Sequence, residues 1–122
     1  MKEFPTLDEL YWLFESDPVL IDPDLGWPIS EATWTTSRGE WKLTVTVGVY
    51  DRKVEITGEL AGNLALHVKL DGVVEHLAVD RTHNMEGLTI APGPNGSFHP
   101  ARLTLKPTVF VDIENRHPWE RA

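Results

Sequence analysis

The sequence predicts an α+β domain in which an N-terminal helix packs on a curved antiparallel β-meander of about six to eight strands. Three observations predict this class. Apolar residues recur at helical spacing near the N-terminus, apolar and polar residues alternate from residue 32 onward, and short turn sequences separate the alternating runs. The 122 residues suit one core, so we expect a single domain over residues 1–122.

The helix is expected over about residues 6–16. Thr6 and Glu9 form the T-x-x-E pattern of a capping box, which marks a helix start. Pro18 disfavours helical geometry in the residue before it and so ends the helix. Four residues at helical spacing are predicted to form its apolar face: Leu7, Leu10, Tyr11 and Phe14.

Residues 17–30 are predicted to form a stiff, irregular loop, which we call the acidic loop. Pro18, Pro23 and Pro28 each remove a backbone donor and fix φ, so this segment cannot continue the helix. Proline also restricts the unfolded chain, which lowers the entropy lost on ordering the loop. Its aliphatic residues are expected to attach it to the core: Val19, Leu20, Ile21 and Leu25.

An antiparallel sheet is predicted over about residues 32–114, followed by a polar tail over 115–122. One face of such a sheet is apolar and must be covered. The helix covers part of this face, and sheet curvature, partial closure into a barrel or a partner covers the rest. The clearest strand has five alternate residues that point inward: Trp41, Leu43, Val45, Val47 and Val49.

Asp71-Gly72 is a two-residue hairpin signal, and it predicts that the strands on either side of it pair. The register pairs Leu70 with Val73 and places His67 directly opposite His76. Opposed side chains have Cβ atoms about 4.5 to 5.5 Å apart, so two imidazoles there could share a zinc ion if further ligands were present. We favour the alternative of two polar residues on an outer sheet face, and we predict no metal and no cofactor.

The net charge of −8 is concentrated at the front of the chain. Residues 1–31 hold eight acids and one base, whereas residues 32–122 hold eleven acids and ten bases. Phosphate contacts need Lys and Arg, so this distribution argues against nucleic acid as a partner. It favours a basic protein partner, because opposite charge speeds association. The alternative is an acidic surface that serves only solubility.

Several function classes are disfavoured by the sequence. The absence of cysteine excludes disulfides, thiolate metal sites and cysteine nucleophiles. No apolar run reaches the roughly 18 to 20 residues that span a bilayer, and the first residues lack the apolar run of a signal peptide, so we expect a cytoplasmic protein without a membrane partner. No serine lies in a G-x-S-x-G nucleophile elbow, and we expect no enzyme activity.

Two other interpretations remain open. The curved sheet could bind a small ligand or hydrolyse one near Glu75, His67 and His76, since Glu75 is an acid placed on the inward face, where burial raises a carboxyl pKa. The protein could instead self-associate through an uncovered sheet face or through the edge at Pro107. The sequence does not predict the oligomeric state.

The favoured hypothesis is a non-enzymatic, acidic protein-binding module. A stiff acidic loop that carries one large aromatic residue combines electrostatic steering, low ordering cost and an anchor. In size, charge and composition the chain resembles bacterial immunity proteins and phage-encoded inhibitors, which neutralise a basic toxin or nuclease by covering its active site. The predicted partner-binding residues are Glu15, Asp17, Asp22, Asp24, Trp27 and Glu31.

Overall fold

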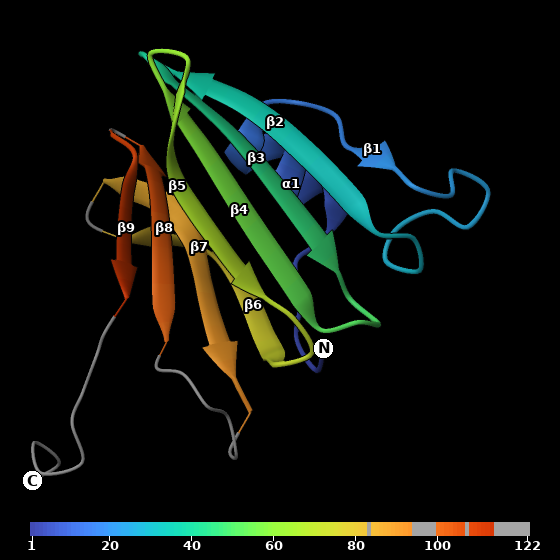
Figure 1. Cartoon of the computed structure of the whole chain (residues 1–122). Coiled ribbons are helices and arrows are strands. Elements are labelled where there is room, and N and C mark those ends of the chain that lie inside the picture. The colour runs from blue at the N-terminus through green and yellow to red at the C-terminus, as the bar shows by residue number, and fades with distance from the viewer. Residues whose placement is uncertain (83, 94–99, 107, 114–122) are drawn as a thin grey trace, which may run out of the picture.

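The computed structural model describes residues 1–82, 84–93, 100–106 and 108–113, and within these residues it contains one helix and nine strands in two antiparallel sheets (Figure 1). The predicted fold class is confirmed. Pro107 and the predicted polar tail lie outside the described residues. The elements are α1 (Leu7–Phe14), β1 (Val19–Leu20), β2 (Ala32–Arg38), β3 (Trp41–Gly48), β4 (Lys53–Leu60), β5 (Asn63–Leu70), β6 (Val74–Thr82), β7 (Met85–Pro92), β8 (Ala101–Lys106) and β9 (Phe110–Ile113).

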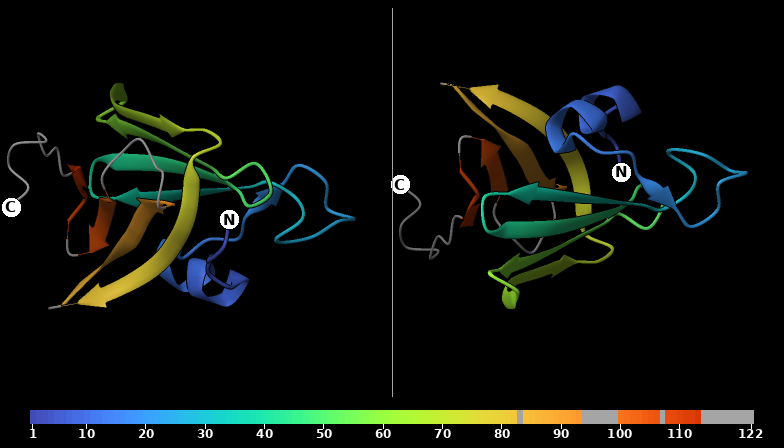
Figure 2. Two further views of the ribbon diagram at one scale, coloured as in Figure 1. Left: turned by 90° about the horizontal axis from the view of Figure 1, so that it is seen from below. Right: turned by 90° about the horizontal axis from the view of Figure 1, so that it is seen from above.

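The strands form two open sheets rather than one continuous meander. The first has the order β1-β2-β3-β4-β5 and the second β6-β7-β8-β9, so neither sheet closes into a barrel within the described residues. Figure 2 shows α1 and the four-stranded sheet on the same side of the five-stranded sheet. α1 contacts both β2 and β6, and the core lies between these two layers.

The helix begins as the capping box predicts. The Thr6 side chain accepts from the Glu9 backbone N–H, and the Glu9 side chain accepts from the Thr6 backbone N–H. The helix ends at Phe14, two residues earlier than expected, because Glu15 adopts a left-handed conformation with φ 55°. Its buried face consists of Leu10, Leu13 and Phe14. The prediction that Leu7 and Tyr11 belong to the buried apolar face is wrong, because both residues are exposed. The helix contacts two layers, β2 and β6, and this packing rather than spacing alone selects the buried face.

The predicted inward row of β3 is confirmed. Leu43, Val45, Val47 and Val49 are buried, and Trp41 is half-buried against the core. Trp41 packs over Gly58 of β4, where a Cβ atom would lie 2.9 Å from the Trp41 ring. A larger residue at this position would have to displace the ring or shift the strand.

The hairpin predicted at Asp71-Gly72 is wrong. β5 pairs with β4, β6 pairs with β7, and the connection between them crosses from one sheet to the other. The backbone N–H groups of Val73 and Val74 both donate to the Arg52 carbonyl oxygen, at 3.2 and 3.0 Å. Crossing lets the inner rows of both sheets bury against each other, whereas a single meander would leave one apolar face open.

The His67–His76 pair is therefore also wrong. His67 lies opposite Thr57, and its Nε2 is 2.9 Å from Glu55 Oε2, whereas His76 lies opposite Ala91 in the other sheet. No group of three or more side chains suited to hold a metal ion occurs among the residues that the structure describes.

The N-terminal residues pair with the outer edge of β6. Lys2 N–H donates to the Glu75 carbonyl oxygen at 2.8 Å, and Leu77 N–H donates to the Glu3 carbonyl oxygen at 3.0 Å. The N-terminal ammonium group donates to the Val49 carbonyl oxygen at 2.9 Å, which ties the chain start to the end of β3. These bonds fix the start of the acidic quarter of the chain against both sheets.

Candidate partner-binding surface

The acidic loop projects beyond the start of β2 and is held by a set of backbone contacts (Figure 1). β1 within it pairs with the start of β2, where Val19 lies opposite Thr33 and Leu20 opposite Ala32. Ile21 N–H extends this pairing by donating to the Glu31 carbonyl oxygen at 3.0 Å. The loop is thus the connection of a wide hairpin.

Ser30 organises the interior of the loop. Its side chain is buried, and its Oγ accepts from Asp22 N–H at 2.9 Å and donates to the Glu31 carbonyl oxygen at 3.0 Å. Ser30 N–H donates to the Gly26 carbonyl oxygen at 2.7 Å. At the tip, Asp24 N–H donates to Asp22 Oδ1 at 3.1 Å, which is an Asx-type turn. These hydrogen bonds connect the two sides of the loop and form its tip.

Trp27 fixes the loop to the core. Its ring makes edge-to-face contacts with Trp34, at 5.5 Å between centroids, and with Phe4, at 6.3 Å. Its Nε1 donates to the Pro5 carbonyl oxygen at 3.2 Å. The side chain is half-buried, and its outer part lies beside the residues that lead into α1. The acidic loop and the acidic start of the helix are therefore neighbours in space.

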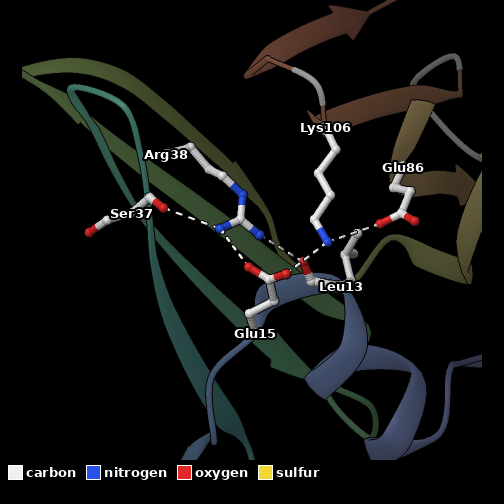
Figure 3. Close-up of polar contacts among 6 residues, drawn as sticks. All are labelled: Leu13, Glu15, Ser37, Arg38, Glu86 and Lys106. Atoms are coloured by element: carbon white, nitrogen blue, oxygen red, sulfur yellow. Dashed lines mark hydrogen bonds and ion pairs between the residues drawn. The ribbon is translucent and has the colours of Figure 1, made fainter. Parts of the chain in front are cut away.

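Glu15 lies at the centre of a charge cluster at the end of α1, where Figure 3 shows it between Arg38 and Lys106. Its carboxylate is 3.1 Å from Arg38 Nη1 and 3.1 Å from Lys106 Nζ, and Lys106 also pairs with Glu86 at 3.2 Å. Arg38 Nη2 donates to the Leu13 carbonyl oxygen at 3.3 Å, which caps the helix C-terminus. The hydrogen bond from Lys106, together with the nearby charges of Arg38 and Lys106, holds the pKa of Glu15 below its usual range.

Glu31 is the second acid of the predicted set that is paired. Its carboxylate is 2.6 Å from Lys53 Nζ, and the two side chains are about one-fifth exposed, at 17% and 22%. The hydrogen bond to Glu31 raises the pKa of Lys53. Glu15 and Glu31 thus anchor the two ends of the acidic loop to the sheets.

Asp17, Asp22 and Asp24 have a different environment. All three residues are exposed, and none of them takes part in the ion pairs found among the described residues. The six predicted residues therefore divide into two groups. Glu15, Glu31 and Trp27 contact the rest of the protein, whereas these three aspartates present their charge to solvent.

The aliphatic residues of the loop do not attach it to the core as expected. Only Leu20 packs against the core, while Val19, Ile21 and Leu25 are 73%, 72% and 52% exposed. For Val19 and Ile21 the strand pairing explains this, because adjacent residues of a strand point to opposite faces and Leu20 takes the inward one. Val19, Leu20 and Ile21 are consecutive aliphatic residues, so no apolar–polar alternation in the sequence marks which of them are exposed.

Glu75 does not support the alternative of a hydrolytic site. Its Oε1 accepts from Arg52 Nη1 at 3.1 Å, and this contact lowers the pKa of Glu75, contrary to the expected rise. Between the sheets the structure has an apolar cavity of about 50 Å³ lined by residues that include Ile56, Val68 and Leu103. Small-molecule sites are usually about 300 to 1,000 Å³, so this cavity is too small for one.

Comparison with known proteins identifies the fold. No family and no curated protein matches the sequence. The architecture is that of a small two-sheet protein with an ordered acidic loop, and it is similar to a chain of a solved complex. That complex is a contact-dependent growth inhibition toxin–immunity protein complex from Klebsiella pneumoniae 342. The similarity has a TM-score of 0.75 with 17% identity and covers 93% of this chain and 96% of that one, which shows that the two chains share one fold.

Among the described residues, no helix has the length and apolar character needed to cross a membrane.

Proposed function

We propose that this chain is a non-enzymatic immunity protein that binds and neutralises a toxin. The observation that carries the proposal is the fold shared with a chain of a toxin–immunity protein complex over nearly the whole length of both chains. We further propose that the toxin is basic, as a nuclease would be, and that the encounter takes place in the cytoplasm.

The charge distribution supports a basic partner. The first 31 residues hold eight acids and one base, and three of these acids lie exposed on one stiff loop. A nuclease must present cations to the phosphates of its substrate. An anionic surface that docks over those cations attracts the toxin at long range and blocks access of the nucleic acid.

The six predicted residues take two roles in this proposal. Asp17, Asp22 and Asp24 face the toxin and steer its approach. Glu15, Glu31 and Trp27 hold the loop in the binding conformation, which lowers the entropy lost when the complex forms. Residues of both groups should matter for neutralisation, but only the first group should govern the association rate.

The test uses the toxin encoded by the neighbouring gene, since an immunity protein is expected to be encoded beside its toxin. Co-expression of this chain should restore growth of cells that produce the toxin. In stopped-flow or surface-binding kinetics, Asp17→Lys with Asp24→Lys should lower the association rate constant on the order of tenfold at low salt, with a smaller effect at high salt. Asp22 is kept, because its carboxylate forms the turn at the loop tip.

A matched control places the same charge change elsewhere. Glu40 and Asp51 are exposed in the β2–β3 and β3–β4 connections, so Glu40→Lys with Asp51→Lys alters net charge equally without touching the acidic loop. The control should retain most of the wild-type association rate. Equal losses in both variants would show that only net charge matters and would refute the proposed surface. Failure of the wild-type chain to protect cells or bind the toxin would refute the immunity function.

A further inference from the structure

The acidic loop exposes a group of aliphatic side chains that its own fold does not use. Val19, Ile21, Leu25 and Ile29 are 73%, 72%, 52% and 49% exposed. Single exposed apolar residues are ordinary on protein surfaces, whereas four of them lie here within residues 19–29. Exposed apolar residues with a polar rim are typical of protein interaction sites.

The hydrogen bonds of the loop bring the two backbone segments that carry these residues side by side. Ile21 N–H donates to the Glu31 carbonyl oxygen and Asp22 N–H donates to Ser30 Oγ, so residues 21–22 run beside residues 30–31. Ile29 precedes this pairing on one side and Ile21 begins it on the other. Leu25 lies in the turn between them, where its N–H donates to the Asp22 carbonyl oxygen at 3.2 Å.

The contacts of the loop oppose a rotation that would bury these side chains in its own core. β1 pairs with β2, Ser30 is buried, and Trp27 is held between two aromatic rings with its Nε1 bonded to Pro5. A rigid apolar surface keeps its binding conformation before the partner arrives, which favours affinity. The same contacts hold the half-buried ring of Trp27 within the protein.

The charges that surround these residues indicate what covers them. Asp17, Asp22 and Asp24 lie within the same segment and are exposed. A second copy of this chain would bring the same three carboxylates to the contact, and an anionic membrane surface would repel them. The complementary surface is an apolar patch with Lys and Arg at its rim.

We propose that Val19, Ile21, Leu25 and Ile29 are the apolar anchors of the toxin interface, and that the three aspartates around them pair with basic residues at the rim. This inference rests on the proposed function and states which residues of the acidic loop supply the binding energy for the toxin. The aliphatic side chains set the dissociation rate through desolvated contact, and the aspartates set the association rate.

The test compares two double variants that each remove two exposed apolar side chains. The first is Ile21→Ser with Leu25→Ser. The control is Tyr50→Ser with Leu64→Ser, because these residues are 73% and 68% exposed and lie outside the acidic loop. Unfolding in urea should be nearly unchanged for both. The probe is the toxin domain encoded by the neighbouring gene, with Kd and dissociation rate measured at physiological and at high salt.

The loop variant should weaken Kd on the order of 100-fold, mainly through faster dissociation and at both salt concentrations, while the control stays within about threefold of wild type. If wild type binds and the loop variant binds equally well, the anchors lie elsewhere and this inference fails while the immunity function stands. If wild type self-associates in solution and the loop variant does not, as judged by mass, then a second copy of this chain covers the surface and the inference of a toxin interface fails. If wild type does not bind the toxin, both proposals fail together.

Discussion

Substitution of Trp27 separates a residue that holds the acidic loop from one that contacts a partner. Trp27→Ala removes two edge-to-face aromatic contacts, with Trp34 at 5.5 Å and Phe4 at 6.3 Å, and a hydrogen bond from Nε1 to Pro5 at 3.2 Å. Each aromatic pair contributes about 0.5 to 1.5 kcal/mol, and the hydrogen bond about 1 kcal/mol. The free energy of unfolding should therefore fall by about 3 kcal/mol, at the lower end of the range for tryptophan-to-alanine changes because the ring is only half-buried.

Urea unfolding followed by far-UV circular dichroism measures this loss without depending on tryptophan fluorescence. For a chain of this size, about 3 kcal/mol corresponds to a fall in Tm of about 10 °C. The control is Trp12→Ala, because Trp12 is 60% exposed and its ring is 5.0 Å from the Arg81 guanidinium carbon. An exposed cation–π contact contributes about 0.5 to 1 kcal/mol, so this variant should lose no more than that. Equal unfolding midpoints for the two variants, with toxin binding lost only in Trp27→Ala, would refute our assignment of Trp27 as a holding residue.

Three further substitutions test the packing, the charge cluster and the loop. Gly58→Ala should lower the free energy of unfolding, measured in urea, by about 1 to 3 kcal/mol, because the new Cβ would lie 2.9 Å from the Trp41 ring. An unchanged midpoint of urea unfolding would show that the ring moves aside without cost. The pKa of Glu15 is lowered in the folded protein, so its ionised carboxylate stabilises the fold above the unfolded pKa of about 4.3, and this effect is lost as pH falls through the lower folded pKa. Below about pH 5, the Tm of Glu15→Gln should therefore fall less steeply with pH than the Tm of wild type. Parallel curves of Tm against pH would contradict this. Ser30→Ala should destabilise by about 1 kcal/mol and speed hydrogen exchange of the Asp22 amide, which donates to Ser30 Oγ; unchanged exchange would show that this bond does not hold the loop.

The features that the sequence predicted are those with local causes. The capping box places the helix start at Thr6, because both hydrogen bonds form within four residues. The inward row of β3 follows from a period of two with apolar residues on one side. In each case the information lies within a few residues of the feature, so no knowledge of distant contacts is needed.

The features that the sequence did not predict depend on contacts between distant residues. Asp71-Gly72 is compatible with a tight hairpin. The Arg52 carbonyl oxygen, however, accepts hydrogen bonds from the N–H groups of Val73 and Val74, about twenty residues later in the chain. These bonds accompany the crossing of the chain into the second sheet. The buried face of the helix depends likewise on β6, which is far away in sequence. The pKa of Glu75 depends on Arg52, which lies in the β3–β4 connection.

The negative charge of the first 31 residues has two physical roles, and the contacts separate them. Glu15 and Glu31 each pair with a base from the remainder of the chain, so their charge is balanced within the protein and holds the ends of the acidic loop. Asp17, Asp22 and Asp24 have no such balance among the described residues, and their mutual repulsion opposes a compact loop. The loop is nevertheless ordered by backbone pairing, by Ser30 and by Trp27. The exposed aspartates and aliphatic side chains of this loop do not stabilise the folded protein itself. We propose that a partner with the opposite charge and a matching apolar patch accounts for this arrangement.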